Sequence, residues 1–263
     1  LAAALAIAAI GIALACANNS GPDSKATTLY GPTVTFAQGT ARAWLQTDAT
    51  GAPAALGLSM TEGALSGLPT TAPGPSPTAL MVTLPLPAEA AVTGFDHAVL
   101  GWNPNGHEPP QLYGAPHFDL HFYLVNSATQ MAILPSDPQF ATKAANFPSA
   151  NFVPAGYVPP PGPAVGNAVP QMGVHWTSTS APELNGQPFT NTFIYGSWDG
   201  KFIFLEPMIT KAYLQTQPNT TQAIPQPAAW AAAGYYPTTY SVKYDAATKE
   251  YRFTLGGMTK RGG

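Results

Sequence analysis

The chain has 263 residues, a net charge of -3, a hydrophobic fraction of 45% and a charged fraction of only 9%. This length and composition fit one large β domain or two small ones, with enough apolar residues for a sizeable core. So few charges of either sign form no basic stripe, which argues against nucleic-acid binding and against an electrostatic membrane patch.

The first 15 residues are uncharged and apolar, and they are too short to span a bilayer as a helix. We therefore predict a signal peptide over residues 1–15. The only cysteine, Cys16, directly follows Ala-Leu-Ala, which resembles a bacterial lipobox. We expect Cys16 to carry a lipid anchor and residues 16–28 to form a polar tether, so that the protein is an extracytoplasmic, membrane-anchored lipoprotein whose membrane contact is the anchor alone. Plain signal-peptidase cleavage would instead leave a secreted or periplasmic soluble protein.

Short apolar runs between turns dominate the chain from residue 29 to residue 261, and no long window keeps a helical period. The runs are 33–48, 54–69, 77–87, 117–125, 191–198, 201–209 and 239–258. Helices are predicted only as short pieces, at 138–145 and 227–233. The sequence therefore predicts one all-β domain over 29–261, a β-sandwich or a barrel-like fold with long proline-rich loops.

Two hairpins are predicted from turn residues. Asp199-Gly200 lies between two apolar runs, which is the strongest short hairpin signal and indicates a type I′ turn with both residues at positive φ. A second hairpin is expected around Asp245 to Lys249. By contrast, residues 147–170 carry seven prolines and exclude a helix or a central strand. We interpret this segment as an ordered loop, because aromatic residues spread through it would pin it down.

The run "PHFDLHFY" holds the most informative polar residues. In a strand, His117, Asp119 and His121 share one face, and the intervening aromatic and leucine side chains face the core. Residues two apart lie ~7 Å apart, but His117 and His121 lie ~13 Å apart, so both reach one ion only if the strand bulges. If the strand is regular, one of the two histidines drops out, and Asp119 or His107 takes its place.

Two more residues complete the expected ligand set. Pairing outward from Asp199-Gly200 places Glu206 opposite Phe193, on a face with Tyr195, Phe202 and Phe204, where an unpaired carboxylate is expensive to bury. His175 lies beside a tryptophan and is either a ligand or a satisfied core residue. We predict that His117, His121, His175 and Glu206 share one divalent ion, with Asp119 and His107 in supporting or alternate roles. Imidazole with carboxylate suits Zn, Mn, Fe or Ni about equally.

Glu108 is the candidate general base, because it follows His107 on a turn-rich loop, where functional residues often lie. Phosphate-binding glycine loops, G-x-S-x-G, H-E-x-x-H and paired cysteines are all missing from the sequence. No catalytic residue is therefore assigned by a known motif.

Four stretches, "GWNPNGHEPPQLYGAPHFDLHFY", "MGVHW", "YGSWDGKFIFLEPMIT" and "YDAATKEYRFTLGGMTKR", resemble an uncharacterised family of extracytoplasmic bacterial β-proteins. The family is typified by a thermophile protein controlled by a sigma-E/anti-sigma-E system. The resemblance implies a secreted or lipid-anchored all-β domain and gives no established activity.

Three kinds of function remain open at this point. The first is a metal-binding envelope lipoprotein that need not be an enzyme, and the second is a metal-dependent, hydrolase-type enzyme on the same ligands. The third is a structural or homo-oligomeric envelope protein whose polar cluster only orders the core.

Overall fold

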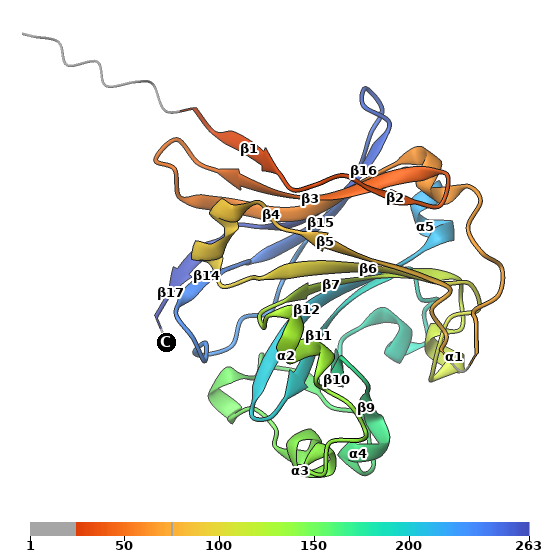
Figure 1. The fold of residues 1–263 in the computed structure, drawn as a ribbon, viewed down its shortest axis with the longest axis vertical. Helices are drawn as coiled ribbons and strands as arrows, with labels where there is room; N and C mark the ends of the chain where they lie inside the picture. The colour runs from red at the N-terminus through yellow and green to blue at the C-terminus, as the bar shows by residue number, and fades with distance from the viewer. Residues whose placement is uncertain (1–24, 75, 263) are drawn as a thin grey trace, which may run out of the picture.

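Two antiparallel sheets stacked face to face form the body of the protein (Figure 1). The computed structural model describes residues 25–74 and 76–262, so the expected signal peptide and Cys16 lie outside the described residues. The sheets do not close into a barrel within the described chain, and the sandwich alternative of the predicted all-β fold is confirmed.

The first sheet has seven strands in the order β1-β3-β4-β16-β15-β13, with β2 also paired to β3. Its strands are β1 (Thr27–Tyr30), β2 (Val34–Phe36), β3 (Gly39–Thr47), β4 (Pro53–Thr61), β13 (Asn219–Ala223), β15 (Thr239–Asp245) and β16 (Glu250–Gly256). Strand β1 begins inside the segment expected to be a tether, and Thr27 pairs with Thr47 of β3.

The second sheet has eight strands in the order β5-β6-β7-β12-β11-β10-β8, with β9 paired to β10. Its strands are β5 (Leu80–Pro85), β6 (His97–Asn103), β7 (His117–Tyr123), β8 (Tyr157–Val158), β9 (Ala168–Val169), β10 (Gly173–Ser178), β11 (Asn191–Trp198) and β12 (Lys201–Thr210). A small separate pair joins β14 (Gly234–Tyr236) to β17 (Thr259–Arg261).

Alternation along β7 divides the second sheet into two chemically different faces. Phe118, Leu120 and Phe122 belong to the main core, and the ring of Phe118 lies 6.2 Å from that of Phe36 in the first sheet. Each such side chain stabilises the fold by about 1.5–3 kcal/mol on full burial. The residues that alternate with them, His117, Asp119 and His121, therefore point away from the first sheet.

The outer face of the second sheet is buried as well, because loops and a short helix cover it. A separate small cluster joins Tyr113 and Phe189 to Ile194 of β11 and Met208 of β12. The ring of Phe189 lies 5.3 Å from His117. All seven residues of β7 are consequently buried, although three of them, His117, Asp119 and His121, are ionisable.

Helices in the described chain are short. They are α1 (Pro110–Tyr113), α2 (Ser127–Met131), α3 (Phe140–Ala145), α4 (Ala164–Asn167) and α5 (Lys211–Gln215), with 3₁₀ turns η1 (Glu62–Leu65), η2 (Ala88–Thr93), η3 (Ala150–Phe152) and η4 (Pro182–Asn185). Within residues 25–74 and 76–262, no helix is long and apolar enough to cross a bilayer.

One predicted helix is present and one is wrong. Helix α3 lies within the predicted segment 138–145. Residues 227–233 are irregular instead, because tertiary contacts override a weak local preference. The Ala229 amide donates to the Asn151 carbonyl at 2.9 Å, and the Trp230 ring stacks on Tyr236 at 3.7 Å.

The proline-rich segment 147–170 packs as a loop against the second sheet. The ring of Phe147 lies 5.2 Å from Trp176, and the Tyr157 hydroxyl donates to the Phe193 carbonyl at 2.8 Å. The expectation that this segment holds no helix is wrong, because it contributes the 3₁₀ turn η3 and the one-turn helix α4 as well as the two-residue strands β8 and β9. Pro163 immediately precedes α4, where a proline removes no helical hydrogen bond. Strands β8 and β9 extend the sheet edge beside His175.

Both predicted hairpins are present. Asp199 and Gly200 have φ of 47° and 82°, which confirms the predicted positive values, and β15 pairs with β16 around residues 246–249. The expected pairing of Glu206 with Phe193 is wrong. The register shifts between Gly196 and Ser197, so Glu206 lies opposite Ile194. A bulge displaces every later pair by one residue, and turn residues alone do not predict it.

Candidate metal centre

Five strands bring the site residues to one buried face. Asn103 of β6 pairs with His117 of β7, and Met208 of β12 pairs with Asp119. Because the pairing of β7 with β12 keeps its register, His121 and Glu206 fall side by side on that same face. His175 reaches it from β10, where it pairs with Gly196 of β11. Residues widely separated in sequence are thus placed together by sheet pairing.

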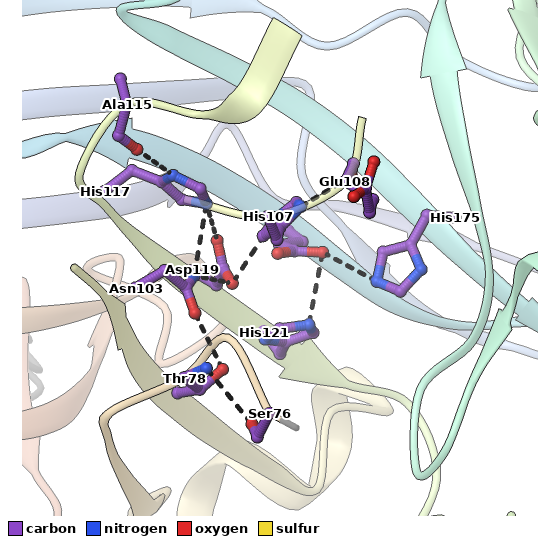
Figure 2. A network of polar contacts seen from close by, with 11 residues as sticks. Ser76, Thr78, Asn103, His107, Glu108, Ala115, His117, Asp119, His121 and His175 are labelled. Carbon is purple, nitrogen blue, oxygen red and sulfur yellow. Dashed lines mark hydrogen bonds and ion pairs between the residues drawn. The ribbon is translucent and has the colours of Figure 1, made fainter. Parts of the chain in front are cut away.

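The structure divides the expected ligand set into two groups (Figure 2). His121, His175 and Glu206 form one group, which we call the Glu206 group. His107, His117 and Asp119 form the other, which we call the Asp119 group. In each group the potential ligand atoms lie within 4.8 Å of one another.

The expected single site of four ligands is therefore replaced by two groups of three. Strand β7 is regular along its pairing with β6, so no bulge brings His117 to His121. His117 and His121 therefore stay ~13 Å apart along the strand, as expected for a regular strand. Asp119 and His107 do not replace His117 in the Glu206 group; they join it in a group of its own.

Short contacts without hydrogen bonds define the Glu206 group. The Nε2 atom of His121 lies 3.3 Å from Oε2 of Glu206, and Nε2 of His175 lies 3.7 Å from the same oxygen. Within the described chain, Glu206 Oε2 and both ring nitrogens of His121 are buried and lack a hydrogen-bond partner. Two ligands bound to one tetrahedral ion at about 2.0–2.1 Å lie about 3.3–3.4 Å apart, which matches the shorter contact.

The ring of Phe204 packs against both histidines of the Glu206 group. The ring of Phe204 lies 4.7 Å from His121 and 5.3 Å from His175. A Cβ atom at Gly196 would collide with the Phe204 ring, so the ring can occupy this position only because residue 196 is glycine. In the described part of the chain, the His121 ring is consequently held by packing rather than by hydrogen bonds.

Burial sets the protonation of the Glu206 group. It lowers the pKa of His121 to about 4. Burial, followed by the charge of His121, lowers the pKa of His175 to about 3, although 22% of its side chain is exposed. Burial, followed by the charge of Asp119, raises the pKa of Glu206 well above its usual range. At neutral pH both imidazoles are therefore ready to bind a cation, and a cation would displace a proton from Glu206.

A continuous polar network holds the Asp119 group. Thr78 donates to Asn103 at 2.8 Å, and the Asn103 amide donates to Asp119 Oδ2 at 2.6 Å. Nε2 of His117 lies 3.1 Å from Asp119 Oδ1 and 3.2 Å from Asn103 Nδ2. Nε2 of His107 lies 3.9 Å from Asp119 Oδ2. Asn103 and Thr78 are not among the predicted site residues, since long-range pairing brings them there: β6–β7 pairing places Asn103 beside His117, and β5–β6 pairing places Thr78 beside Asn103.

Charge rather than burial decides the protonation of the His117–Asp119 pair. Burial acts to lower the pKa of His117, but the charge of Asp119, with the backbone carbonyl of Ala115 after it, outweighs burial and raises that pKa. Burial acts to raise the pKa of Asp119, but His117, with His107 and His121 after it, lowers that pKa. The pair thus favours an imidazolium beside a carboxylate when only protons are available.

The candidate base Glu108 and the remaining histidine, His97, belong to neither group. His97 lies between Asp96 Oδ1 and Gln130 Oε1, each 2.8 Å from a ring nitrogen, which is the arrangement of a satisfied buried histidine. The Glu108 side chain is exposed, and its backbone carbonyl, rather than its carboxylate, accepts a hydrogen bond from His107 at 2.9 Å.

Comparison with known proteins adds a family likeness over part of the chain. Residues 48–102 match the family model described as TTHB210-like, hypothetical protein TTHB210, a family of unknown function. The match spans β4, β5 and most of β6 and ends one residue before Asn103. No curated protein and no solved structure matches the chain. The geometry of the two groups is therefore the main guide to function.

Proposed function

We propose that this protein is an extracytoplasmic β-sandwich that binds a divalent metal ion through His121, His175 and Glu206. One observation supports this most strongly: Nε2 of His121 and Oε2 of Glu206 lie 3.3 Å apart, both buried, with no hydrogen bond within the described chain. Buried polar atoms without partners are expensive, and a shared cation would satisfy both atoms.

Two imidazoles and a carboxylate fit Zn, Mn, Fe or Ni. Such a set occupies three positions of a tetrahedral ion and leaves a fourth for water or another ligand. His175 is the partly exposed member of the group, so solvent would reach a bound ion from its side of the site. The donor set favours no single one of these four metals.

Metal titration tests this proposal. Protein treated with a chelator and dialysed is titrated with Zn²⁺ by calorimetry, and the bound metal is counted by mass spectrometry. Glu206→Gln should weaken binding at this group by 10-fold or more, since the amide offers no negative charge. Glu183→Gln is the matched control, because Glu183 is also a buried carboxylate but lies outside both groups. Equal Zn²⁺ binding by wild type and Glu206→Gln would reject the site.

A metal-dependent, hydrolase-type enzyme on the same ligands is the second candidate. The open position on a three-ligand ion favours it, since metal-bound water is a ready nucleophile. Glu108 is then the proposed general base. Zn²⁺- and Mn²⁺-loaded protein should cleave members of a panel of chromogenic esters and phosphoesters. Glu108→Gln should lose that activity while keeping its metal.

The cellular setting is proposed from the sequence. Lipidation of Cys16 would anchor the domain to the membrane, and the resemblance to a family of extracytoplasmic proteins supports a place outside the cytoplasm. Cys16→Ser in the full-length gene should move the protein from the membrane fraction to the soluble extracytoplasmic fraction. Unchanged membrane association of the Cys16→Ser variant would show that Cys16 does not anchor the protein.

Homo-oligomer formation is a further proposal, which sedimentation of the purified domain would test.

A further inference from the structure

We propose that His107, His117 and Asp119 form a second divalent-cation site, separate from the Glu206 group, so that the chain binds two ions side by side. This goes beyond the proposed function, because no residue belongs to both groups. Each group has its own carboxylate and two imidazoles, so each offers a complete set of three ligands.

Backbone carbonyls fix both histidines of the Asp119 group in one tautomer. Nδ1 of His117 lies 2.7 Å from the Ala115 carbonyl, and Nδ1 of His107 lies 2.9 Å from the Glu108 carbonyl. A carbonyl only accepts, so each Nδ1 carries the hydrogen, and each neutral ring has its lone pair on Nε2. This is the arrangement by which proteins orient histidine ligands of metals.

The two lone pairs face a carboxylate. Nε2 of His117 lies 3.1 Å from Asp119 Oδ1, and Nε2 of His107 lies 3.9 Å from Asp119 Oδ2. Asp119 Oδ1 is buried without a hydrogen-bond partner in the part of the chain that the structure describes. Acceptors that face one another repel unless a positive charge lies between them. A divalent cation supplies that charge to all three side chains at once.

Neighbouring residues keep the group in place without competing for the free oxygen. Asn103 donates to Asp119 Oδ2 at 2.6 Å, which leaves Oδ1 available. The longer contact from Asn103 to Nε2 of His117, at 3.2 Å, is the one that an ion would replace. The His107 ring packs against His117 at 4.7 Å and Tyr113 at 5.8 Å, so this loop residue is ordered.

The rival occupant is a proton, which would make His117 an imidazolium paired with Asp119. A proton satisfies that pair but offers no partner to Nε2 of His107, which lies 3.9 Å from Asp119 Oδ2. His107 therefore separates the two explanations. It is 24% exposed on its loop, so replacing it disturbs the core little.

The test counts Zn²⁺ and Co²⁺ ions bound per chain after chelator treatment and dialysis. Wild type should bind two ions, and Glu206→Gln, His107→Ala and Asp119→Asn should each bind one. The visible spectrum of Co²⁺ in Glu206→Gln should report imidazole coordination and be lost in the Glu206→Gln, His107→Ala double variant. Circular dichroism checks that each variant is folded, and Glu183→Gln should keep both ions.

Other outcomes overturn the second site. One ion in wild type, lost in Glu206→Gln but kept in His107→Ala and Asp119→Asn, would leave the proposed function standing and remove the second site. Two ions in wild type, with neither His107→Ala nor Asp119→Asn losing one, would place the second ion elsewhere. One ion that survives Glu206→Gln but is lost in His107→Ala would support the Asp119 group and reject the proposed function instead. Zero ions would reject both sites.

Discussion

Nε2 of His121 lies 3.3 Å from Oε2 of Glu206, and within the described chain neither atom has a hydrogen-bond partner. The two residues are 85 positions apart and meet because β7 pairs with β12. A buried carboxylate beside buried imidazoles is costly unless a charge or a hydrogen bond compensates. A divalent cation bound between the two atoms would compensate both.

Metal binding should stabilise the fold. A ligand that binds only the native state, at about 100 times its Kd, raises the free energy of unfolding by about 2.7 kcal/mol. For a domain of this size the rise in Tm should be about 5–10 °C. Differential scanning fluorimetry with Zn²⁺ measures it, and Glu183→Gln should respond like wild type. An unchanged Tm in wild type at saturating Zn²⁺ would contradict the prediction.

Metal affinity at the Glu206 group should increase with pH. Burial raises the pKa of Glu206, so near neutrality the metal-free carboxyl is protonated and binding expels about one proton. His121 and His175, with pKa values of about 4 and about 3, are already neutral and release none. Calorimetry in buffers of different ionisation enthalpy counts the protons, with His107→Ala used to isolate this group. Affinity that does not change between about pH 6 and 8 would speak against it.

The Asp119–His117 pair should stabilise the metal-free protein in a defined pH window. The pKa of Asp119 is lowered, so its contribution is present above its unfolded pKa of about 4 and is lost as pH falls through the folded value. The pKa of His117 is raised, so its contribution is complete below its unfolded pKa of about 6.5 and is lost as pH rises through the folded value. The pair is strongest between these limits.

Urea unfolding across pH, in the presence of a chelator, measures the contribution of the pair. Asp119→Asn should lower the free energy of unfolding by about 3–5 kcal/mol inside the window, the usual cost of breaking a buried pair. Asp137→Asn is the control. Asp137 pairs with Lys143 on the surface, where the loss should be about 0–1 kcal/mol. A pH-independent deficit in Asp119→Asn would show that its charge is not the cause.

Gly200→Val should destabilise the β11–β12 hairpin, from which Glu206 projects. Gly200 has φ of 82°, and a β-branched residue there costs about 1–3 kcal/mol. Gly200→Asn is the matched control, since asparagine accepts positive φ better than other non-glycine residues and should lose less. Thermal melts of both variants make the comparison. Equal melting temperatures for Gly200→Val and wild type would exclude strain at the turn.

Local sequence patterns predict much of the strand and hairpin structure that carries the site. The alternation of "HFDLHFY" separated core from polar residues correctly, and Asp199-Gly200 set the hairpin. Both signals act over a few residues, where side-chain direction and φ preference leave little freedom. The helix expected at 227–233 failed because contacts to distant residues, such as that of Trp230 with Tyr236, outweigh propensity in a short segment.

The division of the site residues into two groups is harder to predict from the sequence. Regular strand spacing already showed that His117 and His121 are too far apart for one ion. Which partners each histidine takes depends on the pairing of β7 with β12 and of β10 with β11, and on the bulge between Gly196 and Ser197. These are long-range choices that no local pattern encodes.

Anomalous X-ray scattering from crystals of the Zn²⁺-loaded protein, measured on both sides of the zinc edge, tests the central claim most directly. We expect a zinc peak about 2.0–2.2 Å from Nε2 of His121, Nε2 of His175 and a carboxylate oxygen of Glu206. No zinc peak between these three side chains, in crystals whose solution holds zinc well above the measured Kd, would contradict it.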